Sequence, residues 1–325
     1  MKPSHVSQAL RTLIAINRPA FVWGAPGVGK SNIVAQVAAE LGRQLIDIRA
    51  VLLDPVDLRG LPHVNGDGRA HWATPAFLPR DGEGILFLDE LNAAPPLVQA
   101  ACYQLVLDRK LGEYTLPDGW AVLAAGNRET DRAVTSRMPS ALANRFIHLD
   151  FEPDLDDWCQ WALQAGKQVE VVAFLRFRPN LLHAFDPDRK AFSSPRSWAF
   201  ASDIVAIQAD AAIEYDLLAG AVGEGEAAEL LAFLKVFRQL PSPDAVLMTP
   251  DTAPVPDDPA TVYALCGALA RKASPANFDR IAAYARRLSA EFGVLLVKDA
   301  VTLTPDCQHS QGFIAWATDN GAVLT

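Results

Sequence analysis

The feature that most constrains this chain is a glycine-rich loop that joins an apolar run to an amphipathic segment. Residues 24–31 read Gly-Ala-Pro-Gly-Val-Gly-Lys-Ser and match the spacing G-x-x-x-x-G-K-[ST]. Glycines let such a loop point successive backbone N–H groups at phosphate oxygens, and the following helix adds free N–H groups and its positive dipole end. The pattern predicts a site for a nucleoside triphosphate. The alternative is a glycine turn that matches the spacing by chance.

Individual positions in the loop have distinct expected roles. Lys30 is expected to contact the β- and γ-phosphates, and the Ser31 hydroxyl is expected to coordinate Mg²⁺. ATP or ADP together with Mg²⁺ are therefore the expected cofactors. The predicted nucleotide-binding residues are Gly24, Ala25, Pro26, Gly27, Val28, Gly29, Lys30, Ser31 and Asn32.

The segments on either side of the loop fit this interpretation. Residues 19–23 are short, apolar and bounded by a proline, which is typical of a buried parallel strand. After the loop, the apolar side chains fall on one face of a helix that Gly42 would end. Those side chains are Ile33, Val34, Val37, Ala38 and Leu41.

Composition narrows the class of protein. The chain has 325 residues, half of them hydrophobic, which is enough for two domains and a sizeable core. The formal charge of −9 disfavours a surface that coats nucleic acid, because phosphate affinity comes from accumulated Lys and Arg. No apolar run approaches the ~20 residues of a membrane span and no signal-peptide pattern opens the chain, so a cytoplasmic protein is expected.

The cysteines and histidines do not suggest a metal centre. The four cysteines are widely separated without a C-x-x-C pair, and the six histidines lack the spacing of metal ligands. We therefore expect reduced thiols, and no metal apart from the ion that accompanies the nucleotide.

A second apolar run, residues 84–88, ends in Asp89 and Glu90. The carboxyl ends of parallel strands form the edge at which open α/β sheets bind ligands. Asp89 is expected to act on Mg²⁺ directly or through its hydration shell, and Glu90 to be the base that orients water for attack on the γ-phosphate. The alternative is that both carboxylates only cap the helix predicted at 96–109.

Three further runs complete a set of five predicted strands, at 44–49, 121–127 and 145–150. The strand at 121–127 ends on Asn127, whose amide is expected to hold the attacking water or touch the γ-phosphate. A helix predicted at 7–16 precedes the first strand. The neighbourhood of His5 and Val6 is a candidate adenine contact, with an ordinary covering helix as the alternative.

Two segments interrupt this α/β pattern. Residues 54–79 form a long, turn-rich insertion in which 66–68 marks a tight hairpin, and its apolar residues favour a functional loop over a loose one. Residues 110–120 predict a hairpin with its turn at Pro117-Asp118-Gly119.

Together these features resemble the AAA+ ATPases, and more narrowly the MoxR-type branch, which is related to magnesium-chelatase ATPase subunits and dynein-like modules. The resemblance implies an α/β fold, with a five-stranded parallel sheet followed by a helical lid and a further mainly helical C-terminal region. It covers about residues 1–205. The segments that carry it are 24–31, 54–62, 86–90, 126–127, 140–146 and 194–196.

The resemblance also implies roles for arginines and loops. Arg145 matches an arginine finger that reaches the γ-phosphate of a neighbouring subunit, and Arg137 is a second candidate for that role. Arg196 matches the sensor-two arginine that couples nucleotide state to lid position. The alternative for these arginines is a surface ion pair. Residues 58–79 and 111–120 match loops that project toward a central pore or a partner.

An arginine finger that acts in trans implies an oligomer, because each site is completed only between subunits. By resemblance, a homo-oligomeric ring is expected, most often a hexamer. MoxR-type relatives commonly work with proteins that carry a von Willebrand factor A domain, so such a protein is an expected partner.

The C-terminal part of the sequence is mainly helical. Helices are predicted from 155, at 193–206, at 227–240 and at 261–271, and a strongly periodic one at 277–292, with an exposed connector at 241–259. Arg280, Arg286 and Arg287 form a local basic cluster, which is more often a solvated face than a nucleic-acid site. The expected domains are 1–151 (nucleotide-binding), 152–240 (lid) and 241–325 (C-terminal extension).

The leading functional hypothesis is an ATPase that remodels or activates a protein partner. One alternative is a nucleic-acid motor or loader, which the acidic composition disfavours. Another is a non-hydrolysing scaffold, which has no need for Glu90, Asn127 and Arg145 together. A small-molecule kinase would use the loop but has no need for the projecting segments.

Overall fold

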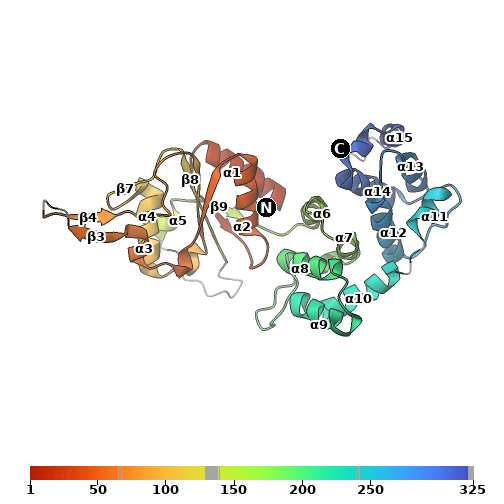
Figure 1. The fold of residues 1–325 in the computed structure, drawn as a ribbon, viewed down its shortest axis with the longest axis horizontal. Helices are drawn as coiled ribbons and strands as arrows, with labels where there is room; N and C mark the ends of the chain where they lie inside the picture. The colour runs from red at the N-terminus through yellow and green to blue at the C-terminus, as the bar shows by residue number, and fades with distance from the viewer. Residues whose placement is uncertain are drawn as a thin grey trace. The chain divides into compact units, whose positions relative to one another are not determined.

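The computed structural model (Figure 1) describes residues 1–64, 66, 68–128, 138, 140–238, 240 and 242–320. The chain divides into two compact units, residues 1–154 and 155–325. The finer domain boundaries expected at 151 and 240 stay a prediction. None of the helices in the described residues combines the length and apolar character that crossing a bilayer requires.

A five-stranded parallel sheet lies at the centre of the first unit, as the sequence predicts. Its strands lie in the order β2-β5-β8-β1-β9, so strands that are distant in sequence are neighbours. This order brings the segments that follow β1, β5 and β8 to one edge of the sheet. The bounds are β1 Ala20–Trp23, β2 Gln44–Arg49, β5 Gly84–Asp89, β8 Trp120–Gly126 and β9 Ile147–Asp150.

Helices cover both faces of this sheet. Alternate residues of each strand point to opposite faces, so Phe21 joins one core cluster while Ala20 and Val22 join the other. Helices α1 and α2 contribute to the second cluster, and α4 contributes to the first. The helices of this unit are α1 Pro3–Ala15, α2 Lys30–Glu40, α3 Pro55–Arg59, α4 Pro96–Asp108 and α5 Ser140–Ala143, with short 3₁₀ turns η1 Ala50–Leu52 and η2 Leu91–Ala93.

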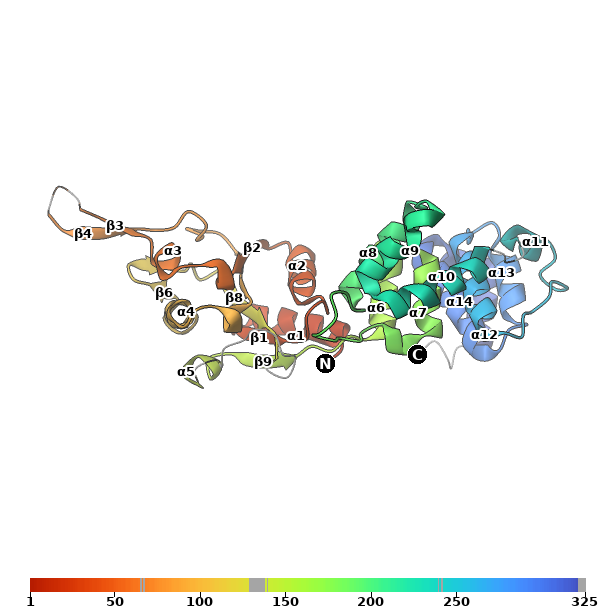
Figure 2. The same ribbon diagram turned by 90° about the horizontal axis from the view of Figure 1, so that it is seen from below.

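The insertion before β5 contains the predicted hairpin and, in addition, a short helix that was not predicted. It begins with α3, where the Asp57 carboxylate accepts a hydrogen bond from the Asp54 N–H at 2.8 Å. It continues as an antiparallel hairpin of β3 Leu61–Val64 and β4 Ala70–Ala73. Both views show this hairpin extending well beyond the sheet and its helices (Figures 1 and 2).

The hairpin predicted at 110–120 exists, but its turn was misplaced. Strands β6 Lys110–Leu111 and β7 Tyr114–Thr115 pair around Gly112, whose φ of 59° suits glycine. The Pro117-Asp118-Gly119 segment instead makes a separate turn into β8, closed by the Trp120 N–H donating to Pro117 O at 3.0 Å. Both segments carry turn residues, and the sequence pattern alone did not rank them.

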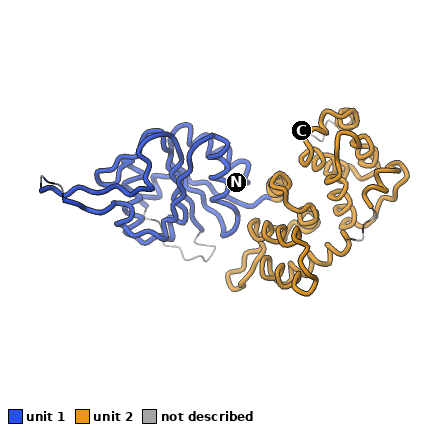
Figure 3. The backbone as a smooth tube through the Cα atoms, in the orientation of Figure 1, with its two compact units in different colours: residues 1–154 blue, residues 155–325 orange. Residues whose placement is uncertain are grey.

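In the described part of the second unit (Figure 3) the regular elements are helices, joined by loops and by one isolated β-bridge between Ala184 and Ser193. One core cluster is built mainly from α6 to α10, and another mainly from α11 to α15. Helix α12 contributes side chains to both. The bounds are α6 Leu155–Gln164, α7 Val169–Phe177, η4 Pro179–Leu181, α8 Pro195–Ala206, α9 Ala211–Val222, α10 Glu224–Arg238, α11 Pro243–Met248, α12 Pro259–Arg271, α13 Phe278–Ala285, α14 Ala290–Leu303, η5 Pro305–His309 and α15 Gln311–Asp319.

Two predictions for this unit were wrong. The periodic segment 277–292 is not one helix, because the chain turns between α13 and α14. The backbones are so close there that a Cβ on Gly293 would lie 2.7 Å from Ala285 O. The connector at 241–259 is not simply exposed, since it contains α11 and buries Val246, Leu247 and Ala253.

The basic cluster of the second unit is engaged in internal contacts. Arg287 donates to the backbone carbonyls of Pro250 and Ala253, both at 2.6 Å. Arg286 pairs with the Asp319 carboxylate at 3.2 Å. These arginines fix chain segments within the unit.

Candidate functional site

The glycine-rich loop leaves β1 and returns into α2. Its last residue, Gly29, caps the helix with a φ of 103°, and Gly27 has a φ of 80°. Residues that carry a Cβ rarely adopt these φ values, so both positions favour glycine. Gly24 is required for space, because a Cβ there would lie 2.9 Å from Phe151 O. The loop therefore presents backbone and the N-terminus of α2 rather than side chains.

Lys30 joins the loop to the end of β8. Its Nζ donates to Asn127 Oδ1 at 2.8 Å, to Gly24 O at 2.7 Å and to Ala25 O at 3.0 Å. Strands β1 and β8 are neighbours in the sheet, which is why Asn127 comes beside a loop that lies about a hundred residues earlier. The structure thus brings together two side chains that the sequence assigned separately to phosphate contacts.

Ser31 and Asp89 meet in the same way. Ser31 Oγ donates to Asp89 Oδ2 at 2.7 Å, and the Glu90 N–H donates to Asp89 Oδ1 at 2.9 Å. Asp89 is buried. A hydroxyl and a carboxylate oxygen are hard ligands, and Mg²⁺ usually takes one or two of these from protein and the rest from phosphates and water. The two residues fit that ion.

Two carboxylates, Asp47 and Asp89, lie close enough at this part of the sheet to repel each other. In the register of β2 and β5, Arg49 lies beside Asp89, and Asp47 lies two residues earlier on the same face. Burial, and then the Asp89 charge, raise the pKa of Asp47 above its ordinary value, while Arg49 lowers it. A divalent cation at this edge would relieve the repulsion between the two carboxylates.

Glu90 occupies an unusual backbone conformation at the end of β5. Its φ is 55°, in the left-handed region that non-glycine residues seldom adopt. The chain then enters the tight turn η2, in which the Ala93 N–H donates to Glu90 O at 2.9 Å. Strain of this kind clusters at functional sites. Glu90 is half-buried and follows Asp89 directly, and its backbone N–H contacts the Asp89 carboxylate.

Asn92 supports a candidate site residue, and sequence reasoning did not single it out. Its side chain is 2% exposed, and its Nδ2 donates to Asn127 O at 2.7 Å. It lies against Gly126, where a Cβ would be 2.1 Å from Asn92 Oδ1. A glycine inside a buried strand marks a close approach of this kind, so Gly126 was the available signal.

Arg145 lies at the opposite end of the sheet from these residues, where the parallel strands begin. It follows α5 and precedes β9, so it is at the amino end of a strand that runs parallel to β1. Its guanidinium lies over the Tyr103 ring, 5.8 Å from the centroid, and Nη2 donates to the Tyr103 hydroxyl at 3.3 Å. The side chain is exposed. The structure does not bring Arg145 together with Lys30 or Glu90.

The other two predicted arginines remain predictions. Arg196 is in the second unit, exposed in the first turn of α8, where Ser194 Oγ accepts from the Ser197 N–H at 3.2 Å. Arg137 lies outside the described residues.

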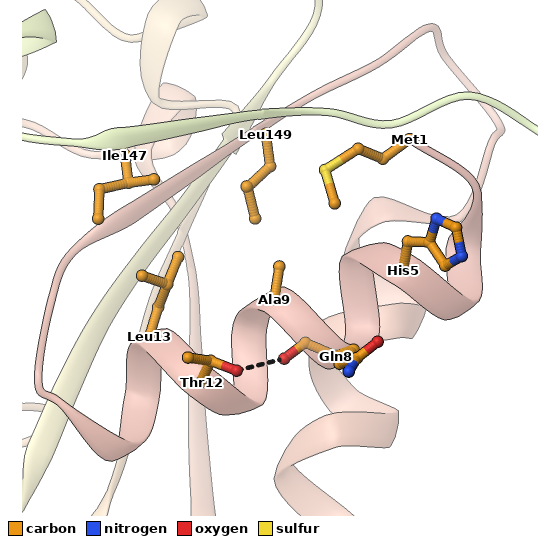
Figure 4. Close-up of a pocket in the computed structure, with 8 residues that line it drawn as sticks. All are labelled: Met1, His5, Gln8, Ala9, Thr12, Leu13, Ile147 and Leu149. Atoms are coloured by element: carbon orange, nitrogen blue, oxygen red, sulfur yellow. Dashed lines mark hydrogen bonds between the residues drawn. The ribbon is translucent and has the colours of Figure 1, made fainter.

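A groove runs between α1 and β9 (Figure 4). His5 lies near one end of it, and the rest of the lining is mostly apolar, with Ala9, Leu13 and Leu149. Val6 does not line the groove, because it is fully buried in the core. Of the two residues named as candidate adenine contacts, only His5 is accessible there.

Comparison with known families agrees with this geometry. Residues 20–148, from β1 into β9, match the family model described as "ATPase family associated with various cellular activities (AAA)". Residues 20–148 are thus similar to the AAA ATPase domain. The matched segment contains Lys30, Ser31, Asp89, Glu90 and Asn127.

Individual relatives are distant. The chain is 30% identical to midasin of Giardia intestinalis over 160 residues, which is 45% of this chain and 3% of midasin. The chain therefore spans only a small part of that relative. Solved structures that it resembles include NtrX of Brucella abortus in complex with ADP, at 14% identity and TM-score 0.44, covering 99% of this chain and 68% of that one. Another is a point mutant of Thermotoga maritima RuvB, at 15% identity and TM-score 0.40, covering 81% of this chain and 79% of that one.

Proposed function

We propose that this protein is an ATP-hydrolysing, Mg²⁺-dependent ring ATPase of MoxR type that remodels or activates a protein partner. The observation that carries the proposal is the meeting of two side-chain pairs at one edge of the sheet. Lys30 meets Asn127 there, and Ser31 meets Asp89. Glu90 follows Asp89 directly. A scaffold that only held nucleotide would not need this set.

Each residue has a defined task in the proposed reaction. Lys30 and the loop N–H groups bind the β- and γ-phosphates, and Ser31 and Asp89 hold the metal. Mg²⁺ supplies neutralisation of the charge on the phosphates. Glu90 accepts a proton from the attacking water, or orients it, while the Asn127 amide holds that water or the γ-phosphate. Arg196 is proposed to couple nucleotide state to the helical unit.

The position of Arg145 supports a site completed between subunits. Four residues of β9 separate it from the carboxyl edge of the sheet, a distance of about 13 Å at ~3.3 Å per residue. An exposed arginine at the opposite edge is suited to reach a neighbouring copy rather than its own site. Its contact with Tyr103 would hold the guanidinium in place on that surface. A homo-oligomer follows from this reasoning, and the resemblance to MoxR-type ATPases makes a ring, most often a hexamer, its proposed form.

The hairpin of β3 and β4 supports a protein partner. It extends beyond the domain (Figure 2) and exposes large apolar side chains. Leu61 is 65% exposed and Val64 is 71% exposed, with Trp72 on the paired strand at 40%. Exposed apolar residues on a projecting element suit contact with a polypeptide better than with phosphates. A partner with a von Willebrand factor A domain, in the cytoplasm, is the proposed context.

The first experiment tests binding and hydrolysis separately. Lys30→Ala should lose binding of a fluorescent ATP analogue, because the variant lacks the ammonium that contacts the phosphates. Glu90→Gln should bind the analogue as the wild type does but hydrolyse ATP at least ~100-fold more slowly. Thr302→Ala, on α14 of the second unit, is a control that should change neither property. Unchanged affinity of Lys30→Ala would overturn the loop assignment, and wild-type turnover of Glu90→Gln would mean that the base lies elsewhere.

The second experiment tests the ring. The mass of the Glu90→Gln form in solution should shift to about six subunits when ATP is added. Mixing Arg145→Ala with Glu90→Gln should restore part of the turnover, because an interface between the two variants can hold an intact Glu90 and an intact Arg145. A monomer under every condition, or a mixture without recovered activity, would rule out the finger in trans.

A further inference from the structure

Arg128 follows Asn127 directly and holds the chain segment that leaves the sheet after β9. Its Nη2 pairs with Glu152 Oε1 at 2.6 Å and donates to Phe151 O at 3.3 Å. Its Nε lies 3.7 Å from Asp150 Oδ1. The Arg128 guanidinium thus contacts three consecutive residues, 150–152, and the Arg128 side chain is 26% exposed.

Segment 150–152 also contacts the start of the glycine-rich loop. The Phe151 N–H donates to Trp23 O at 2.7 Å, and Phe151 O is the atom that leaves no room for a side chain on Gly24. The Gly24 N–H in turn donates to Gly126 O at 3.3 Å. The first residue of the loop, the end of β8 and the segment 150–152 therefore form one connected group.

Segment 150–152 also has a place in the architecture. It lies at the end of the first unit, and the chain enters α6 of the second unit at Leu155. A displacement of residues 150–152 is therefore transmitted along only two further residues before the helical unit begins.

We propose that Arg128 is a positioning residue that couples Asn127 to the chain segment leading into the helical unit. It acts through Asn127, its neighbour in the chain, and its own contacts are with residues 150–152. When the contacts of the Asn127 side chain change, Arg128 shifts together with Asn127. Because Arg128 contacts residues 150–152, those residues are displaced as well. This role rests on the function proposed above for Asn127.

The expected result follows from the strength of such contacts. Coupling through a network of this kind is worth about 0.5–2 kcal/mol, which corresponds to about 2- to 30-fold in a rate. Arg128→Gln should lower kcat for ATP by that factor and leave the affinity for a fluorescent ADP analogue within about twofold. In the wild type, ADP and ATP should give different hydrogen-exchange rates for amides 151–155, and Arg128→Gln should abolish that difference.

A matched control is available in the same unit. Arg43 has a side chain that is 25% exposed, pairs with Glu83 at 3.7 Å, and donates to Gly119 O at 3.4 Å. It lies beside the amino end of β2, away from Asn127. Arg43→Gln removes the same type of contacts and should leave kcat and the exchange of amides 151–155 unchanged.

A double-mutant cycle separates coupling from simple loss of stability. Glu152→Gln should reproduce the kcat loss in part, and Arg128→Gln/Glu152→Gln should be no worse than Arg128→Gln alone, because the two residues act through one contact. Thermal unfolding of each variant identifies any variant that fails to fold. If Arg128→Gln fails to fold, Glu152→Gln, whose side chain is exposed, tests the same contact in its place.

Three results would overturn the proposal. They are an unchanged kcat with an unchanged exchange difference in Arg128→Gln, additive losses in the cycle, and an equal effect of Arg43→Gln. A wild type that binds no nucleotide would overturn the proposed function as well. A wild type that binds and hydrolyses ATP, with an indifferent Arg128→Gln, would overturn the coupling alone.

Discussion

Gly126→Ala tests whether the site depends on the contact between Asn92 and the end of β8. A Cβ at position 126 would lie 2.1 Å from Asn92 Oδ1 and 2.9 Å from Phe21 Cζ. Ordinary van der Waals contact with a Cβ begins at 3.4 Å. The Asn92 side chain is 2% exposed, so it cannot swing into solvent to make room. We expect the added methyl group to push Asn92 away from Asn127.

The cost has two parts. Forcing a methyl group into a filled core costs about 1–3 kcal/mol. Displacing Asn92 breaks its 2.7 Å hydrogen bond to Asn127 O and leaves a buried acceptor unsatisfied, which costs about 1–3 kcal/mol more. The free energy of unfolding should therefore fall by about 2–6 kcal/mol. ATP turnover should fall as well, because Asn127 is displaced.

Urea unfolding measures this loss, and a second substitution tests its cause. Asn92→Ala creates room for the methyl group, so Gly126→Ala/Asn92→Ala should be more stable than the sum of the two single losses predicts, by at least ~1 kcal/mol. Gly66→Ala is the control, because nothing lies within 4 Å of a Cβ at that hairpin position. It should change stability by less than about 0.5 kcal/mol. Additive losses, or a harmless Gly126→Ala, would refute the steric reasoning.

Three further predictions concern charges and thiols. Asp299→Ala should cost about 3–5 kcal/mol in urea unfolding, because it leaves the 12%-exposed Arg176 without its carboxylate, whereas loss of the exposed Asp244 should cost under ~1 kcal/mol. Equal losses would contradict this. The raised pKa of Asp47 means that its charge destabilises the fold once pH rises through that value, so Asp47→Asn should raise Tm at pH 7 but not below pH 3.8; a shift at both pH values would be inconsistent with it. Burial raises three thiol pKa values to about 12, so mass spectrometry should find no iodoacetamide adducts at pH 8 before unfolding on Cys102, Cys159 and Cys266.

The sheet and the loop could be predicted because their signals are local. A parallel strand buried on both faces is a continuous apolar run, and residues 84–88 and 120–126 have that pattern. The loop spacing made Lys30 and Ser31 candidates for phosphate and metal contacts without any long-range information. Polar residues at the ends of apolar runs then made Asp89 and Asn127 candidates, and their roles stay predictions.

The supporting contacts could not be predicted, because they depend on the order of strands in space. Asn92 follows β5 and Arg128 follows β8, and each contacts a segment that only the observed strand order brings near. In a sequence, an asparagine in a turn and an arginine after a strand are common, so neither residue indicates a particular contact. The same limit applies to the break between α13 and α14, where apolar spacing continues through a turn that Gly293 makes possible.

The contacts of Lys30 indicate how this site would respond to a phosphate. Its Nζ donates to two backbone carbonyls and to the Asn127 amide oxygen, and these three acceptors are neutral. A phosphate oxygen is charged, and hydrogen bonds to charged acceptors are roughly twice as strong as those between neutral groups. We therefore expect phosphate to draw Lys30 away from Asn127 Oδ1, while Asn92 keeps hold of the Asn127 backbone. The side chain of Asn127 would be released to the reaction with its main chain still fixed, and Arg128 would be the residue next to that change.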